Sequence, residues 1–156
     1  MLDTVAPAKK ISKKDYRAEA DALRVELINL QYDLARSDGT VLVLLGGDDR
    51  LAVEDLAELL NEWMDTRYLP TYSFSRRNEE ERRFPPAWRF WKTLPGAGEI
   101  ALIELLDLPS AITGLLSGRL DEASFETEVR RATAFERTLS ADGTTVLKLW
   151  LHLPAT

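Results

Sequence analysis

Two glycines and two aspartates, at 46–49, follow the apolar run TVLVLL and form the segment whose residue types best suit chemistry. A short apolar run of this kind is typical of a buried parallel strand, and open α/β sheets bind their ligands where such strands end. A phosphate-binding loop at that place uses small residues, whose backbone N–H groups surround the phosphate, and a lysine that supplies positive charge. Residues 46–55 (GGDDRLAVED) contain no Gly-Lys-Ser/Thr. On residue types alone, the glycines indicate a tight strand-to-helix turn more than a phosphate site.

Arginines gather in a second segment, residues 76–92, which also carries the glutamates 79–81. The surplus of positive charge could bind a polyanion. Alternation of the two signs favours the other interpretation, a solvated face with salt bridges. The candidate polyanion-binding residues are Arg76, Arg77, Arg82, Arg83 and Arg89. The net charge of the whole chain is −6, which argues against a general nucleic-acid binder, so we expect no DNA partner.

The residue types that the chain lacks exclude several kinds of site. There is no cysteine, so disulfides, thiolate metal sites and cysteine nucleophiles are excluded. The single histidine, His152, cannot form a histidine metal cluster alone, and no metal site is predicted. The N-terminal residues include no apolar stretch of signal-peptide length, and no apolar run reaches the roughly 18 residues of a membrane span. We therefore expect a cytoplasmic protein without a membrane partner.

The elements that must position these residues alternate along a chain of 156 residues, a length that suits one domain. Residues 1–11 indicate a flexible lead-in, and Ser12 with Asp15 indicates the start of a helix that ends near Ser37. The expected strands are 40–45, 68–74, 100–105 and 145–151, and the further helices are 54–64, 78–91 with an interruption at two prolines, 109–116 and 121–139. Such alternation predicts a three-layer α/β domain whose mainly parallel sheet has about four strands.

Several long segments resemble the polyphosphate kinase 2 family. They are KKDYRAEADALRVELINLQYDL at 13–34, LLNEWMD at 59–65, PPAWRFWKTLPGAGEIAL at 85–102 and AFERTLSADGTTVLKLWLHL at 134–153. Within that family, the chain is most similar to the amino-terminal domain of tandem-domain polyphosphate:AMP phosphotransferases. The resemblance covers roughly residues 9–153. It implies a thymidylate-kinase-like P-loop domain over 12–153, with polyphosphate or a nucleotide as the ligand, and the alternation of strands and helices agrees with that fold.

The phosphate loop of the family reads G-x-D-x-x-G-K-G, and the resemblance places it on residues 47–54. Gly47 and Asp49 match its first glycine and its aspartate. At its second glycine, its lysine and its last glycine the chain has Ala52, Val53 and Glu54. The family's second motif is typically D-R-S-W-Y, and Glu104 falls at its aspartate, while the arginine, the serine and both aromatics are missing. The family's basic lid segment would follow His152, close to the last residue.

These replacements oppose phosphate binding. Val53 removes the cation that would face the phosphate, while Glu54 and Asp55 put carboxylates at a helix N-terminus, where they would cap the helix and repel an anion. A carboxylate about 4 Å from a phosphate costs roughly 1 kcal/mol in water-like surroundings and about 4 kcal/mol at an effective dielectric near 20. The vestigial catalytic pair, Asp49 and Glu104, could still hold Mg²⁺ if activity remains. Surface acids on loops, without a role, are the favoured alternative.

The losses and the resemblance together imply a degenerate, non-catalytic domain that acts as a regulatory or association partner of an active polyphosphate:nucleotide phosphotransferase. One alternative is a polyphosphate-dependent AMP or ADP phosphotransferase that another chain completes. A third is a module that binds a polyanion through residues 76–92. Arg89 lies in the run WRFW that the family shares, and three aromatics in four residues favour helix packing over a phosphate-facing role.

Two predicted helices indicate how the domain packs and associates. The long helix carries apolar residues at helical spacing that should face the sheet, namely Phe125, Val129, Ala132 and Leu139. The first helix has one stripe of leucines, with Val25, Ile28 and Tyr32 off that stripe. Apolar residues on two faces exceed what one contact with a sheet requires, and such faces often mark interfaces. We expect a homodimer, or a heterodimer with an active relative, that uses the first helix.

Overall fold

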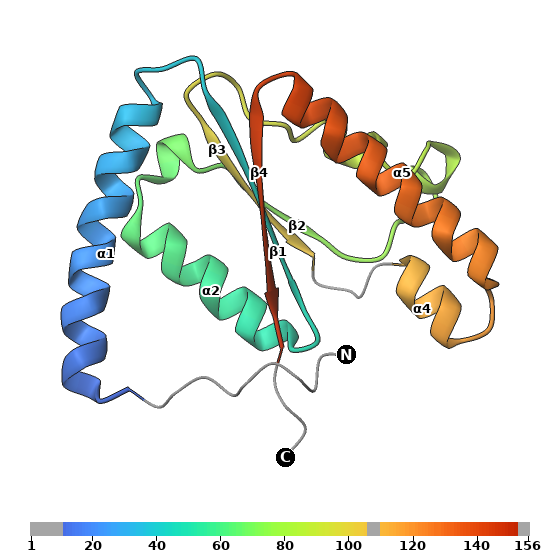
Figure 1. Cartoon of the computed structure of the whole chain (residues 1–156), viewed down its shortest axis with the longest axis horizontal. Coiled ribbons are helices and arrows are strands. Elements are labelled where there is room, and N and C mark those ends of the chain that lie inside the picture. Colours follow the sequence, from blue (N-terminus) through green and yellow to red (C-terminus); the bar gives the residue numbers. More distant parts are fainter. Residues whose placement is uncertain (1–10, 106–109, 153–156) are drawn as a thin grey trace.

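The computed structural model describes residues 11–105 and 110–152, which form three layers around one sheet (Figure 1). The sheet contains four strands, β1 (Thr40–Gly47), β2 (Thr71–Phe74), β3 (Ile100–Leu105) and β4 (Thr144–Leu151). Their order is β2-β3-β1-β4, and every pair of neighbours is parallel. The prediction of a three-layer α/β domain is confirmed. The predicted lead-in, apart from Ile11, and the residues after His152 lie outside the described residues.

Helices cover both faces of the sheet. On one face lie α1 (Lys13–Leu34) and α2 (Arg50–Trp63), and on the other lies α5 (Glu122–Ala141) with α4 (Ser110–Leu116) beside it (Figure 1). The remaining pieces are 3₁₀ turns at Thr66–Tyr68 and Glu81–Arg83 and one helical turn, α3 (Trp88–Trp91).

Successive side chains of the central strand β1 point to opposite faces of the sheet and pack into two cores, one on each face. Val43 and Leu45 pack with Val53 of α2. Leu42, which comes just before Val43 and points to the other face, packs with Leu139 of α5. Wholly apolar strands are typical of parallel sheets that helices cover on both faces, which explains the run at 40–45.

Helix α1 contacts the rest of the domain along a narrow strip. The buried Gln31 exchanges two hydrogen bonds of 2.8 Å with the backbone of Asp65, in the loop after α2. Leu27 and Leu34 are partly buried against the core on the α2 side of the sheet. Most other side chains of α1 are exposed, including the large apolar ones.

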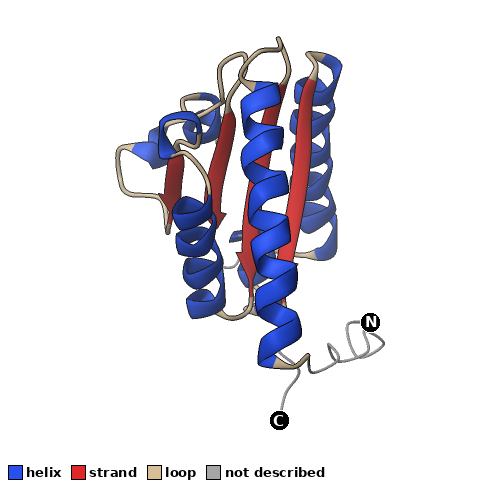
Figure 2. Ribbon diagram, turned by 90° about the vertical axis from the view of Figure 1, so that its left-hand side faces the viewer, coloured by secondary structure: helices blue, strands red, loops and turns tan. Residues whose placement is uncertain are grey.

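Strand β4 is an edge of the sheet, and α1 crosses in front of that part of the sheet in Figure 2. Its inner edge pairs with β1 over the whole strand. Leu147, Leu149 and Trp150 are 47%, 36% and 43% exposed, although their sequence is typical of a covered strand. The outer side of β4 therefore lacks the cover that β1 and β3 have within the described residues.

Several predicted boundaries and faces were wrong. Helix α1 begins after its N-cap Ser12, as predicted, but ends at Leu34, because the Ser37 hydroxyl bonds the Leu34 carbonyl at 2.9 Å and closes a turn there. Helix α2 begins at Arg50 rather than at 54. The helix expected over 78–91 is reduced to two short turns, since the prolines at 85 and 86 lack the N–H that a helix interior needs.

Only part of the predicted face of α5 meets the sheet. Leu139 is buried, whereas Val129 and Ala132 are exposed. The contact is made by the second half of the helix, through Phe135 and Leu139, because the first half extends away from the strands toward α4 (Figure 1). Asp121 is the N-cap of this helix, and hydrogen bonds from the Ser124 side chain and backbone lower the pKa of that carboxyl.

Candidate functional site

The turn that joins β1 to α2 leaves no room for a long phosphate loop. Asp48 and Asp49 alone separate the last residue of β1 from the first residue of α2. The Asp48 N–H donates to the Leu151 carbonyl at 3.2 Å, so the carboxyl ends of β1 and β4 are tied together. A Cβ at Gly47 would overlap that same carbonyl, which explains the glycine. The phosphate loop that the resemblance placed on 47–54 is therefore mostly helix, because α2 already begins at Arg50.

Asp49 is the N-cap of α2. Its Oδ1 accepts the N–H of Leu51 at 2.9 Å and the N–H of Ala52 at 3.3 Å. Free N–H groups at a helix N-terminus, with the helix dipole, are what such a terminus offers to a phosphate. The Asp49 carboxylate thus accepts two of the N–H groups that this terminus could offer to an anion.

Glu54 and Asp55 do not cap α2, contrary to the prediction. The helix starts at Arg50, so both residues lie beyond the first turn, where backbone N–H groups bond within the helix. Glu54 instead accepts the Arg50 Nε–H at 2.8 Å in an exposed pair. Such pairs stabilise a helix by about 0.2–0.5 kcal/mol.

Val53, at the position of the family's lysine, points into the core. It is 1% exposed and belongs to the same cluster as Leu45 and Leu102. The early start of α2 at Arg50 turns this position toward the sheet. A cation there would face apolar side chains instead of a phosphate.

Asp49→Ala is expected to lower the free energy of unfolding by about 1 kcal/mol, within the roughly 0.5–2 kcal/mol of an N-cap. The reason is that the N–H groups of Leu51 and Ala52 lose their acceptor. Glu54→Ala and Asp55→Ala are matched controls that remove a carboxylate from the same helix, and each should cost less than about 0.5 kcal/mol. Urea unfolding measures all three. Equal losses would contradict the assignment of the cap to Asp49.

His152 contacts the Asp48 carboxylate through Nδ1, beside the turn after β1. The two residues are 104 positions apart, and the pairing of β4 with β1 brings them together. The sequence contains no local signal for such a contact. It adds a second tie between the ends of β1 and β4, next to the hydrogen bond that Asp48 makes to Leu151.

Glu104 lies in β3, so its interpretation as a surface acid on a loop is wrong. It is 8% exposed, and its Oε1 accepts the Ser73 hydroxyl of β2 at 2.9 Å. Ser73 is its register partner in the neighbouring strand, and a buried carboxylate needs such a donor. The rest of the expected second motif, 106–108, lies outside the described residues.

The arginines of 76–92 do not form one salt-bridged face. Arg77 and Arg82 donate to backbone carbonyls of their own segment, at 3.3 and 3.2 Å. Arg76 and Arg83 are exposed and have no ion pair within residues 11–105 and 110–152. The expected alternation of charges thus produces one ion pair in this part of the structure, between Arg89 and Glu81.

Arg89 is enclosed by protein groups. Its guanidinium pairs with Glu81 at 3.1 Å, donates to the Ser75 carbonyl at 2.8 Å and lies 4.4 Å from the centre of the Phe74 ring. The two charged side chains are only 13% and 19% exposed, and the Arg89 Nε is buried without a hydrogen-bond partner. Arg89 therefore holds its segment against the end of β2. This agrees with the interpretation that residues 88–91 (WRFW) serve packing and not phosphate binding.

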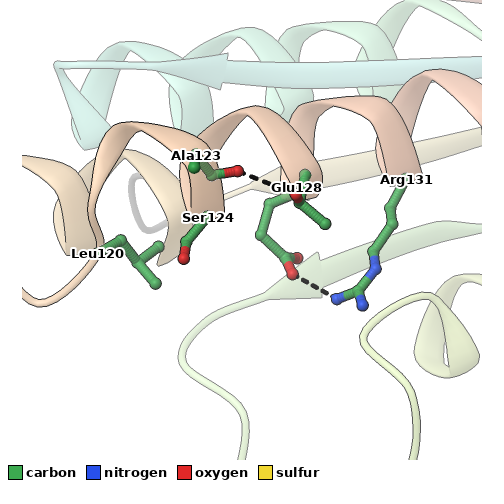
Figure 3. A pocket seen from close by; sticks show the side chains of 6 residues that line it. Leu120, Ala123, Ser124, Glu128 and Arg131 are labelled. Carbon is green, nitrogen blue, oxygen red and sulfur yellow. Dashed lines mark hydrogen bonds and ion pairs between the residues drawn. The ribbon is translucent and has the colours of Figure 1, made fainter.

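A pocket of about 400 Å³ on α5 contains none of the predicted site residues (Figure 3). The Glu128 carboxylate accepts from Arg131 at 2.6 Å, and the Thr127 hydroxyl donates to the Ala123 carbonyl at 2.9 Å. The helix thus satisfies these polar groups itself.

The described residues form neither a clustered metal site nor a membrane-spanning helix. No three or more His, Cys, Asp or Glu side chains of 11–105 and 110–152 gather closely enough to hold a metal ion, and Asp49 and Glu104 are part of no such group. None of the helices described is long and apolar enough to cross a bilayer.

The family model and the relatives that match this chain agree with one another. The family model for polyphosphate kinase 2 matches residues 10–156. The polyphosphate:AMP phosphotransferase of Pseudomonas aeruginosa is 30% identical over 154 residues, which are 98% of this chain and 31% of that protein. The NDP-polyphosphate phosphotransferase 3 of Ruegeria pomeroyi is 28% identical over 144 residues, or 92% of this chain and 48% of that protein. The chain therefore spans between about a third and a half of these relatives.

Solved structures agree. The crystal structure of a polyphosphate kinase 2 from P. aeruginosa PA01 matches with a TM-score of 0.88 and 31% identity, over 99% of this chain and 33% of that one. The polyphosphate kinase 2 from Arthrobacter aurescens TC1 matches in fold, with a TM-score of 0.84 and 23% identity, over 99% of this chain and 58% of that one. With a family model that covers nearly all residues, this chain belongs to the polyphosphate kinase 2 family.

Proposed function

We propose that this chain is a polyphosphate kinase 2 domain that does not catalyse phosphoryl transfer by itself. Its role is that of an association or regulatory partner of an active polyphosphate:nucleotide phosphotransferase. The observation that carries the proposal is Val53, which stands at the position of the family's lysine, is 1% exposed in the apolar core and offers a phosphate no cation. At the same turn the N-cap carboxylate of Asp49, a residue that the family's loop also has, accepts the N–H groups of Leu51 and Ala52.

The surrounding side chains support the same conclusion. Val53 offers no cation and is buried. Arg50, the basic residue nearest in sequence, is paired with Glu54. Phosphoryl transfer relies on positioning and on stabilisation of negative charge, and this turn supplies neither. If another chain does complete the site, the names of the relatives point to polyphosphate with AMP or a nucleoside diphosphate as substrates, and Mg²⁺ would accompany them.

The purified chain, incubated with polyphosphate, Mg²⁺ and AMP or ADP, is expected to form no product above the background without protein. An active phosphotransferase of the family, run in parallel, verifies the assay. Adding the chain to that enzyme should change its kcat or KM, whereas an equal amount of an unrelated protein should not. Turnover by the chain alone, abolished by Asp49→Asn, would overturn the non-catalytic part. Unchanged kinetics of the active enzyme would overturn the partner part.

A further inference from the structure

A shallow groove of about 650 Å³ runs between α1 and the sheet. Its apolar lining comes from Leu30 and Leu34 of α1 and from Val41 of β1. Leu30 is 53% exposed, although it lines the groove. None of these residues belongs to the turn after β1, so the groove is separate from the phosphate-loop region.

Exposed apolar residues of the open strand β4 lie on the same face of the sheet as the groove. Leu147 and Leu149 are in register with Val43 and Leu45 of β1, so they project from the same face of the sheet. That face is the one on which α1 and α2 lie. Both leucines are substantially exposed, and their strand β4 is the sheet edge next to which α1 lies in Figure 2. A helix laid along α1 would cover the groove and these leucines together.

One wall of the groove is acidic. Glu26 and Asp33 line it seven residues apart, and Glu19 continues the row one heptad earlier. All three are exposed, and none forms an ion pair within the described part of the chain. Arg24, in the same stretch, is directed to α2, where it donates to the Glu62 carbonyl at 3.5 Å. The row is therefore a line of carboxylates beside an apolar surface.

We propose that this groove receives an amphipathic helix of a partner polypeptide, whose apolar stripe covers Leu30 and whose lysines or arginines face the acidic row. Leu23 and Leu30, also seven residues apart, suit side-by-side helix packing. Charge complementarity selects a basic partner over a second copy of this chain, because a second α1 would bring its own acidic row against the first. The proposal rests on the association role proposed above and adds the chemistry of the partner.

The test uses two labelled helical peptides of about 21 residues, or three heptads. Both carry leucines at the a and d positions, and the flanking positions are lysine in one peptide and glutamate in the other. Fluorescence anisotropy with the full chain should give a Kd about tenfold lower for the lysine peptide at low salt, and this preference should shrink as salt rises.

Variants locate the binding surface. Leu30→Gln should weaken the lysine peptide about tenfold, whereas Val25→Gln, a control on another face of α1, should not. Glu26→Lys with Asp33→Lys should invert the preference between the two peptides. Glu58→Lys with Glu62→Lys makes the same change in charge on α2 and should leave the order unchanged.

Three outcomes would overturn the proposal. They are equal binding of the two peptides, a preference that Glu26→Lys with Asp33→Lys leaves unchanged, and dimers in light scattering that Leu30→Gln dissociates, which would assign the groove to a second copy. Peptide binding does not depend on phosphotransferase kinetics, so this test and the activity test can fail independently.

Discussion

Val53→Lys is expected to destabilise the domain by roughly 4–5 kcal/mol at pH 7 through its charge, although it restores the residue type of the family's loop. Val53 is 1% exposed among apolar side chains. Full burial lowers the pKa of a lysine by about 3–5 units, and each unit corresponds to about 1.36 kcal/mol. Restoring the lysine alone should therefore damage the fold without producing a phosphate site.

The pH dependence separates charge from size in this variant. An unfolded lysine has a pKa of about 10.4, and the buried one has a lower pKa. The folded state therefore binds the proton less well. The part of the stability loss that is due to charge is small above about pH 10.4 and grows as pH falls toward the folded pKa. Val53→Met, a long apolar control, should cost about 1–3 kcal/mol at every pH. Guanidinium unfolding at pH 7 and pH 10 measures the stability of both variants. If the lysine variant is no less stable than the methionine variant at pH 7, the side chain at position 53 reaches water.

Gly47→Ala is expected to cost about 1–3 kcal/mol, because the new methyl group meets backbone that cannot move cheaply. The nearest atom is the Leu151 carbonyl oxygen, which already accepts the Asp48 N–H. The ends of β1 and β4 would have to separate. Unfolding in urea, followed by the fluorescence of the four tryptophans, measures the loss.

Gly46→Ala is the matched control for that substitution. Its methyl group would meet the ring of Trp150 at 3.1 Å, a side chain that is 43% exposed and can move. We expect a loss below about 1 kcal/mol. Equal losses at the two glycines would show that the close approach of β1 to β4 at Leu151 is not the limiting contact.

The central strands were predictable because their residues carry the signal locally, whereas the strand expected at 68–74 is shorter, β2 (Thr71–Phe74), with a 3₁₀ turn at Thr66–Tyr68 before it. The apolar runs at 40–45 and 100–105 are the central strands, as expected for a sheet that is covered on both faces. The start of α2 was missed although Asp49 is a preferred N-cap residue, because the turn was interpreted as a longer loop. The helix expected at 78–91 formed only in fragments, since the prolines outweigh the aromatic spacing of its second half.

The site was only partly predictable, because its decisive contacts join distant residues. Family resemblance located Glu104 at the end of the sheet, yet its burial depends on Ser73 in another strand. The contact between Asp48 and His152 depends on the pairing of β1 with β4. No window of sequence contains both partners, so residue spacing could not reveal these contacts.

The position of β1 in the sheet also constrains how the chain can fold during synthesis. Its two neighbours are β3 and β4, and the pairing of Thr40 with Thr144 spans 104 residues. During synthesis β1 leaves the ribosome long before β4 does. The edge of β1 that pairs with β4 therefore stays unpaired while the intervening helices form. Such long-range parallel pairing is slow and leaves unpaired edges exposed to other chains. Completion of the sheet is therefore a late event, and nascent chains of this domain should depend on chaperones until Leu151 has emerged.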